Sequence, residues 1–121
     1  MFSVHTHALV KDNSGAKKIQ CIRILGTSNP KHAYLGNFII CNIVKKTTQS
    51  VFKKKIFLAF INQTKKNTKR RGNFYVRGTK NTVILLSEDI KFFSTRIYGK
   101  TPLEFFRHKI NNFWHYINGL F

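Results

Sequence analysis

Short apolar stretches alternate with polar turns along most of the chain. Each stretch is five to seven residues long and rich in β-branched and aromatic side chains, which favours strands over helices. The expected strands cover residues 4–10, 19–25, 38–44, 56–61, 73–77 and 82–86. Clusters of glycine, asparagine and serine separate them, for example at residues 12–15 and 78–81. This arrangement predicts a mostly β domain, either a barrel or a sandwich.

A helical pattern replaces the strand pattern near the C-terminus. Thr101, Pro102 and Glu104 have the order of a capping box with proline at the first helical position. Apolar residues then recur at spacings of three and four, at Leu103, Phe106, Ile110, Phe113 and Ile117. We therefore expect one domain over residues 1–121, with a barrel at about 1–98 and an amphipathic helical part at about 101–121 packed on it.

The charge of the chain narrows the possible partners. Lysine and arginine number 22 against 4 aspartates and glutamates, which gives a formal net charge of +18. A protein this basic binds polyanions, so nucleic acid is the first expected partner and an anionic membrane surface the second. The basic residues gather at turns and strand ends, and residues 62–73 carry five of them without an acid. This stretch predicts a basic hairpin that meets RNA phosphates.

The same composition argues against enzymes and metal proteins. The four carboxylates are Asp12, Glu88, Asp89 and Glu104, and none lies near a histidine in the sequence. Cys21 and Cys41 are too few for a four-cysteine zinc site, and we interpret both as small buried side chains. His5 and His7 would share one strand face, but no third ligand accompanies them. We expect no catalytic residue, metal or cofactor.

Two other classes of function stay open from the residues alone. An RNA-processing enzyme would use histidines, of which the chain has His5, His7, His32, His108 and His115. A cationic membrane-active protein would fit the charge, but the strand pattern argues against it. Membrane insertion is not expected, because the longest apolar run, residues 56–61, is far shorter than the roughly 20 residues of a spanning helix. Aromatics beside charges, such as Tyr75 and Tyr98, are candidates for stacking on bases.

Several motifs resemble the universal large-subunit ribosomal protein L-fourteen family. The most specific covers residues 12–18 (DNSGAKK) and continues at residues 21–26 (CIRILG). Thr64-Lys65-Lys66, Arg70-Arg71 and Val76-Arg77 resemble the basic ribbon of the family, and residues 95–99 (TRIYG) resemble its threonine–arginine–isoleucine–phenylalanine–glycine motif. Ser94 and Lys100 depart from the usual glycine and proline of that last motif, and the end of the chain from residue 111 does not match.

The resemblance implies a small five-stranded β-barrel with a projecting basic β-ribbon and short C-terminal helices. It implies a structural constituent of the large ribosomal subunit near the intersubunit face, contributing to an intersubunit bridge and to translation. The implied partners are large-subunit rRNA, the third and nineteenth large-subunit protein families, small-subunit rRNA and a ribosome-silencing factor. The candidate RNA-binding residues are Lys17, Lys18, Arg23, Lys45, Lys46, Lys53, Lys54, Lys55, Lys65, Lys66, Lys69, Arg70, Arg71, Arg77, Arg96 and Lys100.

The amino-acid composition suggests the compartment in which the protein is made. Lysine outnumbers arginine 16 to 6, although arginine is often the better phosphate ligand, and isoleucine, asparagine and phenylalanine are abundant. These residues have A/T-rich codons, which points to an A/T-rich genome. Together with the divergent motifs, and with a family match that begins almost at Met1, this predicts a mitochondrially encoded copy. A plastid or an A/T-rich bacterium is the alternative.

Overall fold

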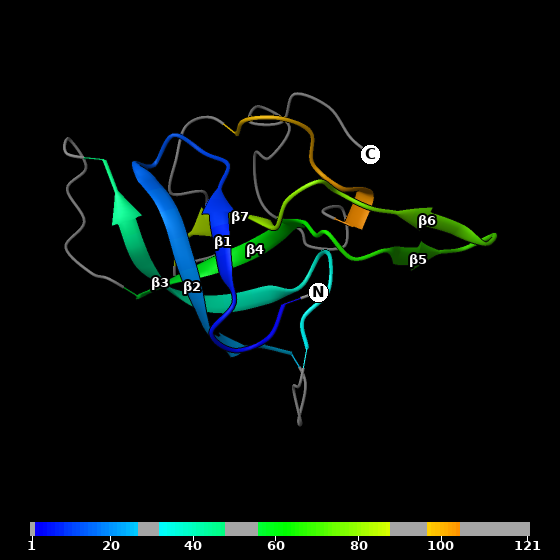
Figure 1. Ribbon diagram of the computed structural model, residues 1–121, viewed down its shortest axis with the longest axis horizontal. Helices are drawn as coiled ribbons and strands as arrows, with labels where there is room; N and C mark the ends of the chain where they lie inside the picture. Colours follow the sequence, from blue (N-terminus) through cyan, green and yellow to red (C-terminus); the bar gives the residue numbers. More distant parts are fainter. Residues whose placement is uncertain (1, 27–31, 48–55, 88–96, 105–121) are drawn as a thin grey trace.

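Seven strands make up the computed structural model, which describes residues 2–26, 32–47, 56–87 and 97–104. They are β1 (His7–Val10), β2 (Ala16–Ile24), β3 (Phe38–Lys46), β4 (Ile56–Gln63), β5 (Thr68–Arg70), β6 (Phe74–Val76) and β7 (Thr82–Leu86). Five strands close a barrel in the order β1-β2-β3-β4-β7. β5 and β6 pair separately and project from the barrel as a ribbon (Figure 1). The predicted five-stranded barrel with a projecting ribbon is confirmed.

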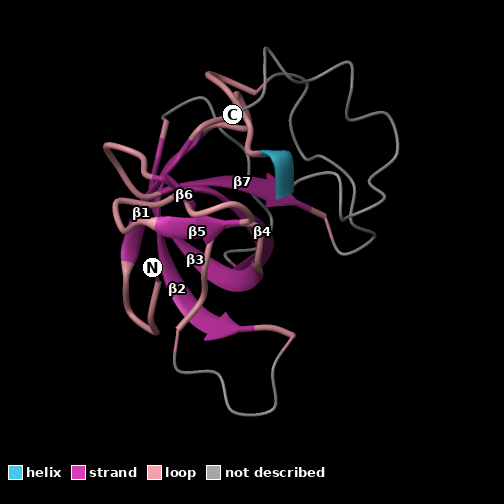
Figure 2. Ribbon diagram, turned by 90° about the vertical axis from the view of Figure 1, so that its right-hand side faces the viewer, coloured by secondary structure: helices cyan, strands magenta, loops and turns pink. Residues whose placement is uncertain are grey.

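Closure of the barrel depends on the pairing of β1 with β7. All other neighbouring strands run antiparallel, whereas β1 and β7 run parallel with Leu9 opposite Thr82 and Val10 opposite Val83. The backbone N–H of Leu9 donates to the carbonyl of Asn81 at 3.0 Å, and that of Lys11 donates to Val83 at 3.0 Å. Figure 2 shows the strands curving around a common interior. Closure leaves no sheet edge on the barrel.

Alternate side chains of the barrel strands fill this interior. Ile19, Cys21 and Ile24 of β2 face Ile39 and Cys41 of β3, and all five are buried. Cys21 and Cys41 are opposite each other in the register of β2 and β3, and both thiols are free. The interpretation of the two cysteines as small core side chains is therefore confirmed.

A second apolar cluster lies on the outer face of β4 and β7. Phe60, Ile84 and Leu86 are buried there with Ile97, and the rings of Phe38 and Phe60 meet edge to face with centroids 5.8 Å apart. Every residue of β7 is consequently buried, which explains why all of its residues after Thr82 are apolar. The segment that carries Ile97 is held in place by the N–H of Tyr98, which donates to Lys11 at 2.8 Å.

Several predicted boundaries differ from the structure. β1 begins at His7, because His5 lies in the preceding turn with a φ of 74°, so the two imidazoles do not share a strand face as expected. Three strands are longer than expected at one end, because they include polar residues. β2 begins at Ala16, before two lysines, β3 ends at Lys46 and β4 ends at Gln63. Polar residues continue these strands because ladder pairing with a neighbour, rather than side-chain burial, keeps the backbone extended.

The expected C-terminal helical part lies mostly outside the described residues. Thr101 and Pro102 are buried, and Leu103 and Glu104 form a short 3-10 turn (Figure 2). Leu103 is 48% exposed although it begins the expected apolar stripe. Phe106, Ile110, Phe113 and Ile117 lie outside the described residues, so the amphipathic helix stays a prediction.

Burial of the two thiols yields a test of the barrel core. Removal from water raises the pKa of Cys21, and it raises the pKa of Cys41 to about 12, with the neighbouring Cys21 adding to the shift. The reactive species is the thiolate, so we expect iodoacetamide to label neither cysteine in the folded protein at mildly alkaline pH. Mass spectrometry should show labelling only at the rate of global unfolding, and complete labelling in denaturant. Rapid stoichiometric labelling under native conditions would contradict this core.

Candidate RNA-binding surface

Four lysines from two distant parts of the sequence meet at one end of the barrel. Lys17 and Lys18 begin β2, and Lys45 and Lys46 end β3. In the register of these strands Lys18 lies opposite Lys45, and Ala16 lies opposite Lys46. Lys17, Lys45 and Lys46 are exposed and Lys18 is partly so. Like charges directly opposite on a sheet destabilise it, so this cluster favours an anionic partner.

The ribbon, residues 68–76, carries the second group of basic side chains. Lys69 of β5 pairs with Tyr75 of β6, and Arg70 pairs with Phe74. Its tip is a turn at Arg71, Gly72 and Asn73, in which Gly72 and Asn73 both adopt positive φ, a conformation that glycine and asparagine tolerate best. Lys69, Arg71 and Arg77 are exposed. The basic hairpin predicted from residues 62–73 is therefore present as an element.

Aromatic side chains accompany these charges on the ribbon. Phe74 is 69% exposed and Tyr75 61% exposed, next to each other on β6. They occupy opposite faces of the strand, because successive side chains alternate. Large exposed aromatics beside cations are suited to stacking on bases, as expected for Tyr75 from the sequence.

Tight packing fixes the root of the ribbon on the barrel. The N–H of Gly78 donates to the carbonyl of Thr64 at 2.7 Å, joining the two chains that lead into the ribbon. A Cβ atom at Gly78 would lie 2.1 Å from Cγ of Gln63, so glycine permits this close approach. Lys65 and Lys66 follow directly and are exposed. Their backbone positions are thereby fixed relative to the barrel.

Arg70 differs from the other candidate residues because it is engaged inside the protein. Its Nε donates to Oε1 of Glu104 at 2.8 Å and its Nη2 to Oε2 at 2.7 Å, a bidentate pair. The two side chains are only 21% and 11% exposed. The hydrogen bond with Glu104 raises the pKa of Arg70, while burial opposes this shift. The sequence grouped Arg70 with the phosphate ligands, but the geometry makes it the residue that ties the ribbon to residues 97–104.

Asp12 is likewise engaged inside the protein. It is 5% exposed, and its Oδ2 accepts the backbone N–H of Leu85 at 3.0 Å. Oδ1 accepts the backbone N–H of Ser14 at 3.0 Å and the Ser14 hydroxyl. Within the described residues, Asp12 and Glu104 are the only carboxylates, and both form structural hydrogen bonds. Both acids are therefore already engaged by groups of the protein, Asp12 by Ser14 and Leu85 and Glu104 by Arg70.

The other candidate residues are scattered. Arg23 on β2 and Lys100 after Gly99 are exposed, whereas Lys53, Lys54, Lys55 and Arg96 lie outside the described residues. Three further basic side chains that were not among the candidate RNA-binding residues line the hollows of the surface, namely Lys11, Lys80 and His7. Lys80 lies in the turn at residues 78–81, which the sequence analysis expected, so its exposed position could have been predicted. A single lysine in a turn does not indicate a binding site by itself. It does so only when the fold places it beside other basic side chains.

The alternative classes find no support in the described residues. His5, His7 and His32 are exposed, His108 and His115 lie outside these residues, and no group of three potential metal ligands occurs in the described part. Where the structure is described, no helix is long and apolar enough to cross a membrane.

A closed barrel that presents clustered lysines and a basic ribbon belongs to the class of small polyanion-binding β proteins. The comparison with known families makes this specific. The chain matches the family described as Ribosomal protein L14p/L23e over residues 1–116, and it belongs to that family. It is therefore a structural protein of the large ribosomal subunit and not an enzyme, associated with rRNA and neighbouring ribosomal proteins. The resemblance inferred from residues 12–18 and 95–99 is confirmed.

The Arg70–Glu104 pair predicts a specific coupling. Glu104→Gln removes the charge but keeps the shape, and we expect it to destabilise the protein by about 2 kcal/mol, the cost of losing charge-assisted hydrogen bonds. Amide exchange at Lys69 and Tyr75 should accelerate more than exchange in β2 or β3.

A double-mutant cycle provides the control. Arg70→Met combined with Glu104→Gln should cost less than the sum of the single substitutions, because neither partner is then left alone in a partly buried site. Strictly additive effects, or ribbon exchange unchanged in Glu104→Gln, would show that the pair does not fix the ribbon.

Proposed function

We propose that the protein binds large-subunit rRNA through backbone phosphates, with the barrel as a rigid platform and the basic side chains as ligands. The proposed contacts are the lysines at the β2–β3 end, the exposed cations of the ribbon and the lysines at its root, Lys65 and Lys66. One observation carries this proposal: lysines from β2 and β3 meet in register at one end of the barrel, while both described carboxylates form structural hydrogen bonds. Phosphate contacts position a protein without reading sequence, which suits a structural component.

Finer assignments extend this proposal. We place the protein near the intersubunit face, in contact with the third and nineteenth large-subunit protein families and, through a bridge, with small-subunit rRNA. A ribosome-silencing factor is a further proposed partner. These assignments are supported by membership of the family and by the basic ribbon, which projects far enough from the barrel to contact a second surface (Figure 1).

The proposed compartment is the mitochondrion, on the strength of the A/T-biased composition. Fractionation of the source organism tests compartment and function together. The protein should sediment with large subunits of mitochondrial ribosomes through a sucrose gradient, and it should leave them only under high-salt stripping. Sedimentation with plastid or cytosolic bacterial ribosomes would retain the function and overturn the compartment.

The ribbon yields a quantitative test of phosphate binding. Replacing Lys69 and Arg71 together by alanine should leave the thermal unfolding temperature unchanged, since both side chains are exposed and outside the barrel core. Binding to rRNA should weaken, and the slope of log affinity against log salt should become shallower by about 1.4 to 1.8, from roughly 0.7 to 0.9 per phosphate contact. Filter binding over a salt series measures both quantities.

A charge-conserving variant is the matched control. Lys69→Arg with Arg71→Lys should keep the wild-type slope, because counterion release depends on charge and not on side-chain shape. Losses should also be similar across unrelated RNA sequences. An unchanged slope in the alanine variant would mean that the ribbon cations are merely solvated.

A further inference from the structure

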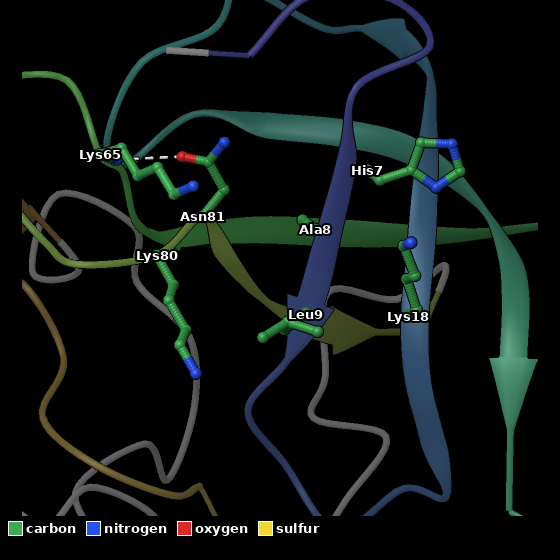
Figure 3. Close-up of a pocket in the computed structure, with 7 residues that line it drawn as sticks. All are labelled: His7, Ala8, Leu9, Lys18, Lys65, Lys80 and Asn81. Carbon is green, nitrogen blue, oxygen red and sulfur yellow. Dashed lines mark hydrogen bonds between the residues drawn. The ribbon is translucent and has the colours of Figure 1, made fainter.

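An open hollow of about 360 Å³ lies where β1, the start of β2 and the root of the ribbon come together. Seven residues line it: His7, Ala8, Leu9, Lys18, Lys65, Lys80 and Asn81. They come from four parts of the sequence, and Figure 3 shows them around β1. His7 and Lys80 were not among the residues expected to bind RNA.

The lining of this hollow is basic on both sides of β1. His7 and Lys18 lie on the side of β2, and the Lys18 ammonium group points toward the imidazole (Figure 3). Lys65 and Lys80 lie on the other side of β1, and Leu9 stands between the two pairs. No lining residue is acidic. An anion in the hollow would therefore meet cationic donors from either side and no repelling carboxylate.

Hydrogen bonds organise the wall formed by Lys65, Lys80 and Asn81. The side-chain Oδ1 of Asn81 accepts the backbone N–H of Lys65 at 3.0 Å, and its backbone carbonyl accepts the N–H of Leu9 at 3.0 Å. Asn81 thereby joins the ribbon root to β1. The same bond orients the amide so that Nδ2, a donor, points away from Lys65 (Figure 3). The backbone of the site is thus fixed before any ligand binds, which lowers the ordering cost of binding.

A second, neighbouring hollow of the same protein can be compared with the first in size and in the charge of its lining. It measures about 440 Å³ and is lined by Lys11, Lys17 and Asp12 together with apolar and uncharged polar residues. Fewer basic side chains line this larger space, and it contains a carboxylate that is bound to Ser14 and Leu85. Size alone would favour this second hollow, but the charge of the lining favours the first for an anion.

We propose that a stretch of RNA sugar–phosphate backbone crosses β1 in the first hollow. One phosphate lies between His7 and Lys18, and the adjacent phosphate lies beside Lys65 and Lys80, with the sugar between them against Leu9. This inference rests on the proposed rRNA binding and adds a defined site, with His7, Lys80 and Asn81 as new ligands. Two pairs of basic side chains separated by Leu9 match the alternation of phosphates and sugars along RNA, in which the C–H face of the ribose can pack on an apolar side chain. They match an acidic peptide less well, because its charges are not separated by such a ring at regular intervals.

Chemical shifts in the full-length, isotope-labelled protein test this site directly. Hexauridylate is the probe, since it offers phosphates without structured bases. We expect it to shift the His7 imidazole and the amides of Leu9, Lys18 and Asn81. Inorganic phosphate and hexaglutamate serve as comparison probes, and each should produce much smaller shifts at these positions. Equal shifts with inorganic phosphate would mean a single-anion site, and equal shifts with hexaglutamate a peptide site; either result overturns the proposal.

Two variants that each remove two charges separate the hollow from the general charge of the protein. Lys18→Gln with Lys80→Gln removes one cation from each side of β1, and Lys69→Gln with Arg71→Gln removes two from the ribbon. Both should make the salt slope shallower by about 1.4 to 1.8. Only the first should abolish the hexauridylate shifts at Leu9 and Asn81. Its unfolding temperature should be no lower than that of the wild type, because Lys18→Gln also removes a like charge opposite Lys45.

The outcomes distinguish this site from the function on which it rests. If rRNA binds while the hollow resonances stay unmoved, or if they still shift in the Lys18→Gln and Lys80→Gln variant, the site is wrong and the proposed function stands. If neither rRNA nor hexauridylate binds the wild-type protein, both proposals fail.

Discussion

Scarcity of carboxylates is the constraint on which the described structure depends. The chain has 4 acidic residues against 22 lysines and arginines. Each carboxylate that is used inside the protein is therefore one fewer to neutralise the basic surface. Asp12 joins the turn after β1 to β7 through Leu85, next to the parallel pairing that closes the barrel. Glu104 fixes the ribbon through Arg70. Each of the two described acids thus joins segments that are distant in the sequence, and the basic surface is left for an external anion.

Local patterns predicted the strands well, because barrel residues alternate between interior and surface. The buried residues of β2 and β3, and residues 83–86 of β7, are visible in the sequence as runs of β-branched and leucine side chains. Residues 12–18 also identified the family before any fold was known, and the role of Asp12 explains why this motif is specific: its carboxylate needs the following Ser14 in a tight turn.

Long-range pairing could not be predicted in the same way. Arg70 and Glu104 are 34 residues apart, and nothing in the local pattern separates Arg70 from Arg71 beside it. The ribbon geometry decides the difference, since Arg70 is the last residue of β5, opposite Phe74, whereas Arg71 lies in the turn at the tip. Likewise His7, Lys18, Lys65 and Lys80 converge only because β1 pairs with both β2 and β7. Clusters of basic residues in the sequence indicated a polyanionic partner. Which of those residues meet in one site depends on the pairing of the strands, which the sequence does not show.

The two parts of the protein differ in what stabilises them. A closed barrel with Ile19, Ile39 and Leu85 fully buried has its stability in its own core. A two-stranded ribbon has no such core and is marginal alone, so it depends on the Arg70–Glu104 pair and, in the proposed function, on bound RNA. Because rRNA binds the folded state, it adds stability by mass action, and this gain falls with rising salt as phosphate contacts weaken. Salt should therefore loosen the ribbon and its root in the complex well before it affects the barrel.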